Sequence, residues 1–370
     1  MSDGTDSPLR VVWVAPWFST LGSLWADGLR ARGHRAMVVT TPMHFDPPPR
    51  HADDLVLEHA WRSEPGLREF LSARKAVRAF RPDVVVTEIA RDPRFLELAR
   101  ATGAPVVFTT HDAVPHDGAN RVPVLRALST RYFARFGSAE VVFSTAVANQ
   151  LGVRRHPVHI VGLTSDLQPS MVPAAAPSDE RRDFLVVGRL SEYKNLGHVI
   201  AAYERHRDSP AFRGDRLVVI GAGDPGCAVP DHVEWVDSRF NFGDLVPRLA
   251  RAKASLCVYS SASQSGVQVV SMHCSTPVVV SDAGGLAEYL PPGEQPVGRR
   301  DVGALAAALD RLADPQTAAA AGALARATYD ARYAVDVTSA EWERVLRRVI
   351  QVATGRRRET PSAGGVPRGL

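Results

Sequence analysis

The feature that most constrains the fold is an alternation of short β-branched runs with helix-like segments, which occurs twice along the chain. Strand-like runs of the first series lie at residues 10–15, 36–40, 83–87, 105–109 and 140–143. Those of the second series lie at 184–187, 217–220, 233–236, 255–259 and 278–281. Such an order predicts parallel sheets covered by helices on both faces. The sequence therefore predicts an α/β protein with two doubly wound, Rossmann-like domains.

The length of 370 residues also exceeds what one ordinary core needs and suits two domains. A stretch rich in proline, alanine and charge separates the two series. The expected parts are an N-terminal domain at 1–165, a linker at 166–181, a C-terminal domain at 182–335, an amphipathic helix at 336–354 that crosses back to the first domain, and a disordered tail at 355–370. Sheets of this type bind ligands at the carboxyl ends of their strands, so we expect a cleft between the domains.

Composition excludes several classes of function. The formal net charge is only +4 and the arginines are spread along the chain, so we expect no nucleic-acid partner. No run of about 20 apolar residues is present, and the polar N-terminus lacks a secretory segment, so we expect a cytoplasmic protein. Cys227, Cys257 and Cys274 are scattered without metal-ligand spacing, which is typical of free buried thiols.

The first motif with chemical content is GRLSEYKN at residues 188–195, which follows a predicted strand and leads into a helix. Gly188 lets the backbone approach a ligand, Arg189 can donate two hydrogen bonds to phosphate oxygens, and Lys194 adds a point charge. These groups suit a diphosphate. The alternative is that both cations are ordinary surface residues.

The second motif is SQSGV at residues 263–267, which follows a strand and begins a helix. Backbone N–H groups at a helix N-terminus, together with the helix dipole, form an anion site. A serine cap with a glycine turn is the structural alternative. The order of the two motifs within the second domain favours anion binding.

Together these motifs resemble the donor-binding domain of the family 4 retaining glycosyltransferases, which have the GT-B fold. The resemblance spans residues 183–313 and includes GRL…KN, VVIGAGDP, YSSASQSGV and TPVVVSDAGGLAE. The first domain resembles the family more loosely, through ARGHRAMVVT, RPDVVVTE and FTTHD. The resemblance implies transfer of a hexose-type sugar from a nucleotide diphosphate-sugar donor to an acceptor, with the donor in the C-terminal domain and the acceptor in the N-terminal domain.

The resemblance also implies roles for individual residues. It assigns Arg189 and Lys194 to the donor diphosphate and places His111 beside the transferred sugar, and these three are the predicted catalytic residues. A structural histidine at a strand end is the alternative for His111. The other predicted donor contacts are Gly188, Gly221, Gly223, Arg239, Phe240, Gln264, Ser265, Gly266, Val267 and Glu288. The predicted acceptor-side residues are Trp17 and a loop containing Gly22 and Ser23.

One departure from the family pattern concerns its two glutamates, which are eight residues apart and contact the sugar and the ribose. An ungapped alignment from Pro277 puts these positions at Ala262 and Val270, and an alignment on Gly266 puts the first at Ser263. Both carboxylates are therefore missing, and a Ser-Gln-Ser-Gly-Val sub-pattern replaces them. Glu288 is the candidate substitute at the ribose, with a helix-capping role as the alternative.

The mechanism expected from these residues uses neither a metal nor a cofactor. The sequence contains no Asp-x-Asp pair to hold a divalent cation, so the two cations and the helix amides would stabilise the leaving diphosphate. Retention of anomeric configuration is implied by the resemblance alone.

The expected acceptor is a small soluble molecule, such as a natural-product aglycone or an aminocyclitol, and membrane association is not expected. One alternative is a polysaccharide or glycolipid glycosyltransferase at a membrane surface, using the arginines at 126, 131 and 135. Another is a catalytically inactive nucleotide-sugar-binding partner. The sequence names neither the sugar, the base nor the oligomeric state.

Overall fold

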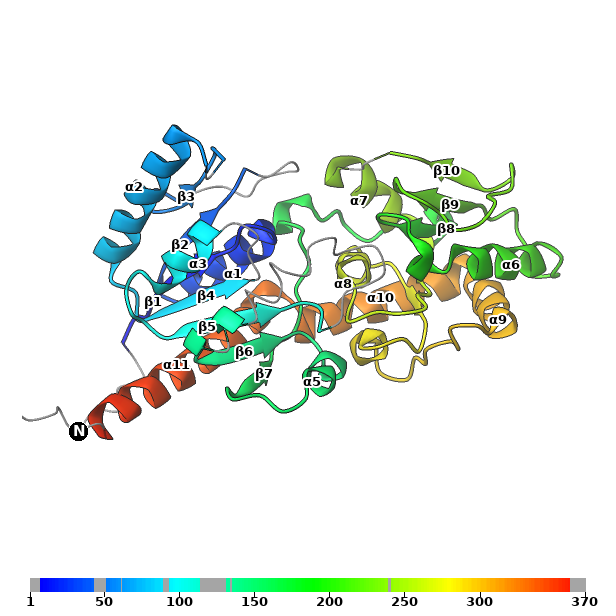
Figure 1. Cartoon of the computed structure of the whole chain (residues 1–370). Coiled ribbons are helices and arrows are strands. Elements are labelled where there is room, and N and C mark those ends of the chain that lie inside the picture. The colour runs from blue at the N-terminus through cyan, green and yellow to red at the C-terminus, as the bar shows by residue number, and fades with distance from the viewer. Residues whose placement is uncertain are drawn as a thin grey trace, which may run out of the picture.

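The computed structural model describes residues 7–42, 51–60, 62–88, 93–113, 131–133, 135–238 and 241–359. Two parallel sheets organise these residues into two lobes (Figure 1). All ten predicted strands are present, within a few residues of their expected bounds. The prediction of two doubly wound α/β units is confirmed.

The first sheet has the strand order β3-β2-β1-β4-β5-β6-β7, and every pair in it is parallel. Its strands are β1 (Arg10–Val14), β2 (Arg35–Thr40), β3 (Leu55–Val56), β4 (Val84–Glu88), β5 (Val106–Thr110), β6 (Ala139–Val142) and β7 (Val158–Ile160). The helices of this lobe are α1 (Ser19–Ala31), α2 (Glu64–Phe80), α3 (Pro93–Arg100) and α5 (Thr145–Leu151). Sequence patterning missed β3 and β7, which are short edge strands.

The second sheet has the order β10-β9-β8-β11-β12 and is also parallel. Its strands are β8 (Arg182–Val187), β9 (Leu217–Ile220), β10 (Glu234–Val236), β11 (Ala252–Cys257) and β12 (Val278–Val280). Its helices are α6 (Leu196–Arg207), α7 (Phe242–Ala250), α8 (Gly266–His273) and α9 (Val302–Ala313), with short 3-10 turns η3 (Glu192–Lys194) and η4 (Leu286–Tyr289). The segment between the sheets contains two further turns, η1 (Pro169–Met171) and η2 (Ser178–Glu180).

Two long helices connect the lobes (Figure 1). Helix α10 (Pro315–Arg332) contacts α8 and α9, and α11 (Val335–Glu359) packs against α1 of the first lobe. Trp342 of α11 is buried against Trp13 and Trp25. Helix α11 continues to Glu359, beyond the predicted end at residue 354, and residues 360–370 of the predicted tail lie outside the described part of the chain. In the described residues, no helix combines the length and the apolar character needed to cross a membrane.

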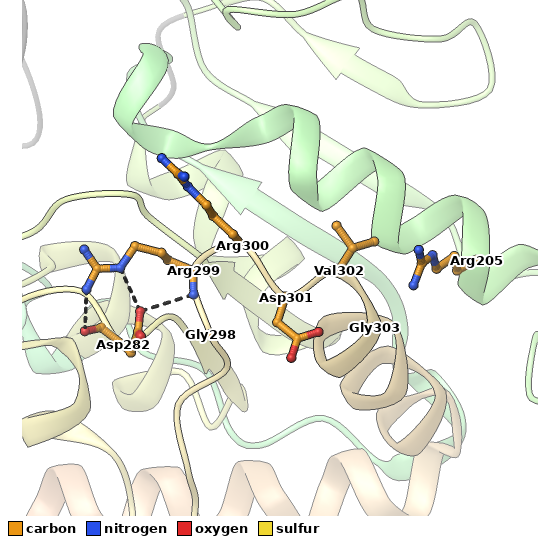
Figure 2. A pocket seen from close by; sticks show the side chains of 8 residues that line it. All are labelled: Arg205, Asp282, Gly298, Arg299, Arg300, Asp301, Val302 and Gly303. Carbon is orange, nitrogen blue, oxygen red and sulfur yellow. Dashed lines mark hydrogen bonds and ion pairs between the residues drawn. The ribbon is translucent and has the colours of Figure 1, made fainter.

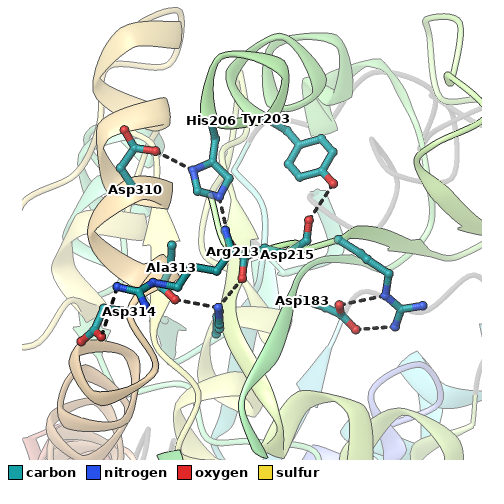
Figure 3. A network of polar contacts seen from close by, with 10 residues as sticks. Asp183, Tyr203, His206, Arg213, Asp215, Asp310, Ala313 and Asp314 are labelled. Atoms are coloured by element: carbon teal, nitrogen blue, oxygen red, sulfur yellow. Dashed lines mark hydrogen bonds and ion pairs between the residues drawn. The ribbon is translucent and has the colours of Figure 1, made fainter. Parts of the chain in front are cut away.

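A buried polar network stabilises the second sheet at the end opposite the site described below (Figure 3). His206 contacts Asp310 at 2.5 Å and Asp215 at 3.1 Å through its two ring nitrogens. Lys253 also contacts the Asp215 carboxylate and donates to the Ala313 carbonyl at 2.6 Å. Burial alone lowers the pKa of His206, but its hydrogen bonds to the two carboxylates reverse the shift and raise the pKa overall. The Asp215 carboxylate therefore compensates the buried Lys253 ammonium and favours the charged form of His206.

We expect Asp215→Asn to lower the free energy of unfolding by about 3–5 kcal/mol, because Lys253 then stays buried without a countercharge. Asp183→Asn is the matched control: Asp183 pairs with Arg216 at 2.6 Å, and the Arg216 side chain is 58% exposed. Loss of such a surface pair costs less than about 1 kcal/mol. Urea unfolding of both variants measures the difference, and equal losses would contradict the compensating role of Asp215.

Candidate functional site

Three glycines bring the backbone at the ends of β8 and β9 into close contact. Gly188, Gly221 and Gly223 have φ angles of 106°, 151° and 134°. A β-carbon on Gly221 would lie 2.1 Å from the Gly188 carbonyl oxygen, and one on Gly223 would lie 2.3 Å from the Leu190 carbonyl oxygen. Only glycine fits these positions. The predicted glycine positions therefore lie together at the carboxyl end of the second sheet.

Lys194 lies directly beside this glycine turn and is only 5% exposed. Its ammonium donates to the Val187 carbonyl at 3.1 Å and to the Tyr259 hydroxyl at 2.8 Å. A β-carbon on Gly188 would be 3.2 Å from Nζ, so a side chain at this position would crowd the ammonium. Burial lowers the pKa of Lys194 to about 8, and the nearby Arg189 acts in the same direction.

Arg189 is exposed, in contrast to Lys194. No hydrogen bond or ion pair ties its guanidinium to another described residue. Its charge nevertheless influences the pKa values of both Lys194 and Tyr193. The structure thus brings together the two cations that the sequence predicts as a diphosphate clamp, one buried and hydrogen-bonded and one exposed.

The N-terminus of α8 faces the same turn. The Ser265 hydroxyl accepts a hydrogen bond from the Gln268 amide at 3.3 Å and caps the helix. The first-turn amides of Gly266 and Val267 have no acceptor within the helix. A β-carbon on Gly188 would lie 3.6 Å from Val267 Cγ2, which places the two motifs side by side. Gln264 adds a buried Oε1 atom without a hydrogen-bond partner among the described residues.

His111 follows β5 in the first lobe and is enclosed by two aromatic rings. The Phe18 ring stacks on it with centroids 3.7 Å apart, and the Phe143 ring lies at 4.6 Å. Burial lowers the pKa of His111 to about 4, while Asp112 opposes the shift. The imidazole is therefore neutral at physiological pH and can orient a ligand by hydrogen bonding.

Glu88 holds the turn that carries Phe18, a role that sequence reasoning did not find. This carboxylate is 4% exposed and accepts hydrogen bonds through Oε1 from the Trp17 amide at 2.6 Å and the Phe18 amide at 2.9 Å. Burial raises the pKa of Glu88 to about 7, against these two hydrogen bonds. Trp17 itself projects outward and is 65% exposed. The only sequence signal was a carboxylate at the end of the VVVTE strand.

The two lobes touch beside these groups. The Asp112 carboxylate is close enough to Tyr193 of the second lobe to contribute to the raised pKa of its hydroxyl, for which burial is the main cause. The Ser144 hydroxyl donates to the Ser263 carbonyl at 3.0 Å. A β-carbon on Gly285 would lie 2.5 Å from both Ser144 Cβ and the Ser263 carbonyl oxygen. The glycine pair of DAGGLAE therefore allows this approach.

Glu288 also spans the lobes. Its two carboxylate oxygens accept from the Thr145 amide at 2.7 Å and from the Ala146 amide at 2.9 Å, the first amides of α5. This is the helix-capping role that was the alternative for Glu288, made between lobes. A ribose contact by the same residue stays a prediction.

The acceptor-side positions need one correction. Gly22 and Ser23 lie in α1 and are buried, not in the loop that was expected. A β-carbon on Gly22 would be 2.7 Å from Ala15 Cβ and 2.9 Å from Trp13 Cδ1, so Gly22 serves close packing of α1 on β1. The turn between β1 and α1 is formed by residues 15–18 instead. Arg239 and Phe240, the predicted base neighbours, lie outside the described residues.

An open pocket of about 680 Å³ lies elsewhere on the second lobe and contains no predicted site residue (Figure 2). It lies between Arg205 of α6 and the loop that carries Arg299, Arg300 and Asp301, and Arg299 pairs with Asp282 at 2.9 Å. We find no group of three or more His, Cys, Asp or Glu side chains arranged to hold a metal ion within the described ranges.

Comparison with protein-family models gives two matches. Residues 23–164 match a model described as "Glycosyl transferase 4-like domain", and residues 181–314 match one described as "Glycosyl transferases group 1". Neither model tests the Ser-Gln-Ser-Gly-Val sub-pattern. No curated protein matches the sequence.

Solved structures with a similar fold include three that cover nearly the whole chain. A sucrose-phosphate synthase from Thermosynechococcus elongatus has a TM-score of 0.67 at 18% identity and covers 92% of this chain and 99% of that chain. The α,α-trehalose 6-phosphate synthase from Burkholderia multivorans gives 0.61 at 14%, covering 96% and 100%. Anabaena HepE in complex with UDP and glucose gives 0.58 at 15%, covering 95% and 100%. These similarities confirm the predicted GT-B fold.

The raised pKa of Glu88 gives a prediction about stability and pH. Unfolded Glu88 ionises near pH 4.5, but in the folded protein it stays protonated up to about pH 7. The unfolded state therefore binds fewer protons between these values, and the Glu88 contribution to stability falls as pH rises through this window. We therefore compare the free energy of unfolding of Glu88→Gln with that of the wild type at both pH values. The difference should shift in favour of Glu88→Gln by roughly 1–3 kcal/mol between pH 4.5 and pH 8.

Urea unfolding at the two pH values measures this double difference. Glu97→Gln is the control, because the Glu97 side chain is 44% exposed. A Glu88→Gln variant whose stability relative to the wild type does not change with pH would show that burial of Glu88 carries no such cost.

Proposed function

The chain is a glycosyltransferase with the GT-B fold, and we propose that it is a metal-independent, retaining enzyme that uses a nucleotide diphosphate-sugar donor. The observation that carries this proposal is the convergence of Lys194, Arg189 and the α8 N-terminus on the glycine turn at Gly188. We further propose a hexose-type sugar, a small soluble acceptor of the natural-product or aminocyclitol kind, and a cytoplasmic location.

A diphosphate fits the charge and geometry of this convergence. Lys194 supplies a fixed ammonium, Arg189 an exposed guanidinium that can donate two parallel hydrogen bonds, and Gly266 and Val267 supply helix amides. The bare Cα of Gly188 would let a phosphate oxygen approach the backbone beside Lys194 Nζ, and the bare Cα of Gly221 accommodates the Gly188 carbonyl. Structures such as that of Anabaena HepE contain UDP and glucose, which supports a nucleotide-sugar donor for the shared fold.

Transfer breaks the bond between the sugar C1 and the distal phosphate oxygen and forms a bond from C1 to the acceptor oxygen. The acceptor proton moves to the leaving phosphate, and the products are the glycosylated acceptor and a nucleoside diphosphate. Negative charge grows on the leaving group during this step. Cationic and amide donors that are already in place stabilise it strongly, because they need little reorganisation. These donors take the part that a divalent metal plays in other transferases.

His111 supports the proposed placement of the sugar. Its neutral ring is held between Phe18 and Phe143. The next residue, Asp112, lies close enough to Tyr193 of the second lobe to influence the pKa of its hydroxyl. A neutral imidazole can form a hydrogen bond with a sugar hydroxyl and, unlike an imidazolium, carries no positive charge that would attract the diphosphate. Retention of configuration follows if the acceptor attacks from the side of the leaving phosphate, which then serves as the base.

The acceptor side is the turn at residues 15–18. Its exposed Trp17 ring presents a flat apolar surface to a ring-shaped acceptor, and Glu88 fixes the backbone of the turn. Of the arginines in the membrane alternative, Arg126 lies outside the described residues, whereas Arg131 and Arg135 are exposed.

Donor class is tested by thermal-shift measurements with UDP-, GDP-, ADP- and dTDP-sugars. A ligand that binds only the folded protein raises its melting temperature, by an amount that grows with concentration. We expect one base series to raise the melting temperature and the matching free nucleoside to have a smaller effect. The absence of a shift with every donor would overturn the proposed donor class.

We expect Lys194→Ala to lower turnover at least about a hundredfold, as for other lost electrostatic donors. Release of nucleoside diphosphate from the donor that binds gives the measurement. Lys75→Ala is the matched control, since Lys75 is an exposed residue of α2. Unchanged turnover in a folded Lys194→Ala protein would refute the assigned role.

We also expect turnover to survive removal of divalent cations. Activity measured after dialysis against EDTA should equal activity with added Mg²⁺ or Mn²⁺, because protein cations neutralise the leaving diphosphate. Activity that vanishes on chelation and returns with Mn²⁺ would exclude the metal-independent mechanism.

A further inference from the structure

We propose that Tyr259 is a positioning residue for the donor site: its hydroxyl joins Lys194 to the N-cap of α8 and aims the ammonium at the donor diphosphate. The inference rests on the proposed function, since it assumes that Lys194 contacts a diphosphate. Tyr259 follows β11 and is buried, and sequence reasoning gave it no role.

The Tyr259 hydroxyl lies at the centre of a buried cluster. It accepts a hydrogen bond from Lys194 Nζ at 2.8 Å and lies 3.4 Å from the Ser265 hydroxyl. The hydroxyl can also donate to the Cys257 sulfur, which lies 3.4 Å from the phenol oxygen. One phenol therefore contacts a residue from each of the two predicted phosphate-binding motifs.

The Tyr259 ring reinforces this arrangement. Lys194 Nζ lies 4.2 Å from the ring centroid, within the range of a cation–π interaction. Tyr193 packs edge-on against the same ring at 5.6 Å, and the Tyr193 carbonyl accepts from the Ser260 amide at 2.8 Å. The loop that carries Lys194 and the loop that precedes α8 are thus fixed to one another through Tyr259 and its neighbour.

The number of donors on Lys194 shows why this matters for a ligand. An ammonium has three N–H groups. Two of them are used by the Val187 carbonyl and the Tyr259 hydroxyl. The third has no partner among the described residues, and Gly188 leaves it room. Two fixed anchors therefore direct the remaining N–H toward the glycine turn.

The hydroxyl also stabilises the charged form of Lys194. The titratable and charged groups around the ammonium are Arg189 after β8, Tyr193 in η3, and Cys257 and Tyr259 at the end of β11. Tyr259 is the one among them that accepts a hydrogen bond from Nζ. Its removal should lower the pKa of Lys194, so that the ammonium loses its proton at lower pH.

The test compares nucleoside-diphosphate binding by the wild type and Tyr259→Phe. Titration calorimetry with UDP, GDP, ADP and dTDP first identifies the diphosphate that binds the wild type most tightly. Tyr259→Phe keeps the ring and removes the hydroxyl, and we expect it to bind this diphosphate roughly ten times more weakly at pH 7, as for a lost hydrogen bond to a charged group. The pH above which affinity declines should also move downward.

Tyr203→Phe is the matched control. The Tyr203 hydroxyl is likewise buried and donates to the Asp215 carbonyl at 2.8 Å, in the network remote from the site. We expect it to change stability without changing affinity or its pH dependence. In a Lys194→Ala background, Tyr259→Phe should have no further effect on affinity, because the two residues act through one contact.

A second measurement does not depend on the folding of the variant. The chain has only three lysines, Lys75, Lys194 and Lys253, so NMR can follow the Lys194 side chain in the wild type. We expect proton–proton contacts between the Lys194 ε-methylene and the Tyr259 ring, and ammonium protons that exchange more slowly than those of Lys75.

The outcomes separate the two proposals. If no nucleoside diphosphate binds the wild type, the proposed function fails and the positioning role fails with it. If the wild type binds but Tyr259→Phe binds equally well with the same pH dependence, the positioning role alone is overturned. Absence of the Lys194–Tyr259 contacts in the wild-type spectrum overturns it as well.

Discussion

The candidate site depends on the burial of one ammonium group, that of Lys194, and on the hydrogen bonds that hold it. Placing Lys194 out of water disfavours its charge, as the lowered pKa shows. Among the described residues, two hydrogen bonds and an aromatic face partly compensate for the lost hydration. A ligand that carries a concentrated negative charge, such as the proposed diphosphate, would supply the missing stabilisation. The burial that disfavours the protonated form of Lys194 in the free protein would also strengthen its attraction to a phosphate, because the local dielectric constant is low.

The geometry of the parallel sheet explains why this group is where it is. Strands β8 and β11 are neighbours in the second sheet, but the chain continues from each of them into a different helix. Lys194 and Tyr259 follow these two strands and meet at the point where strand order reverses, which is where such sheets bind ligands. In the first sheet, the corresponding position is occupied by Glu88, the last residue of β4, and by the turn with Trp17 that follows β1.

Contacts between the lobes connect these two strand ends. Glu288 caps α5 across the interface, and Tyr289 accepts from the Leu163 amide at 3.0 Å while its hydroxyl contacts the Phe143 carbonyl. Phe143 also packs on His111. The His111 ring is therefore connected to the second lobe through Phe143 and Tyr289.

The sequence by itself determined the two-sheet architecture and the two motifs that are predicted to bind phosphate. Buried parallel strands are continuous β-branched runs, and a glycine turn followed by a cation is a local pattern, so both are visible in one dimension. The two- and three-residue edge strands β3 and β7 have no such pattern. The position of Gly22 was misjudged because a helix start and a loop differ little in composition.

Only the tertiary structure decided which distant residues complete the site. Lys194 and Tyr259 are 65 positions apart, Glu88 and the Trp17 amide 71, and Glu288 and the Thr145 amide 143. A hydroxyl or carboxylate has no sequence pattern that names its partner, because that partner is chosen by strand order and by the packing of one lobe on the other. The chain specifies locally which groups it carries, and the fold determines which of them meet.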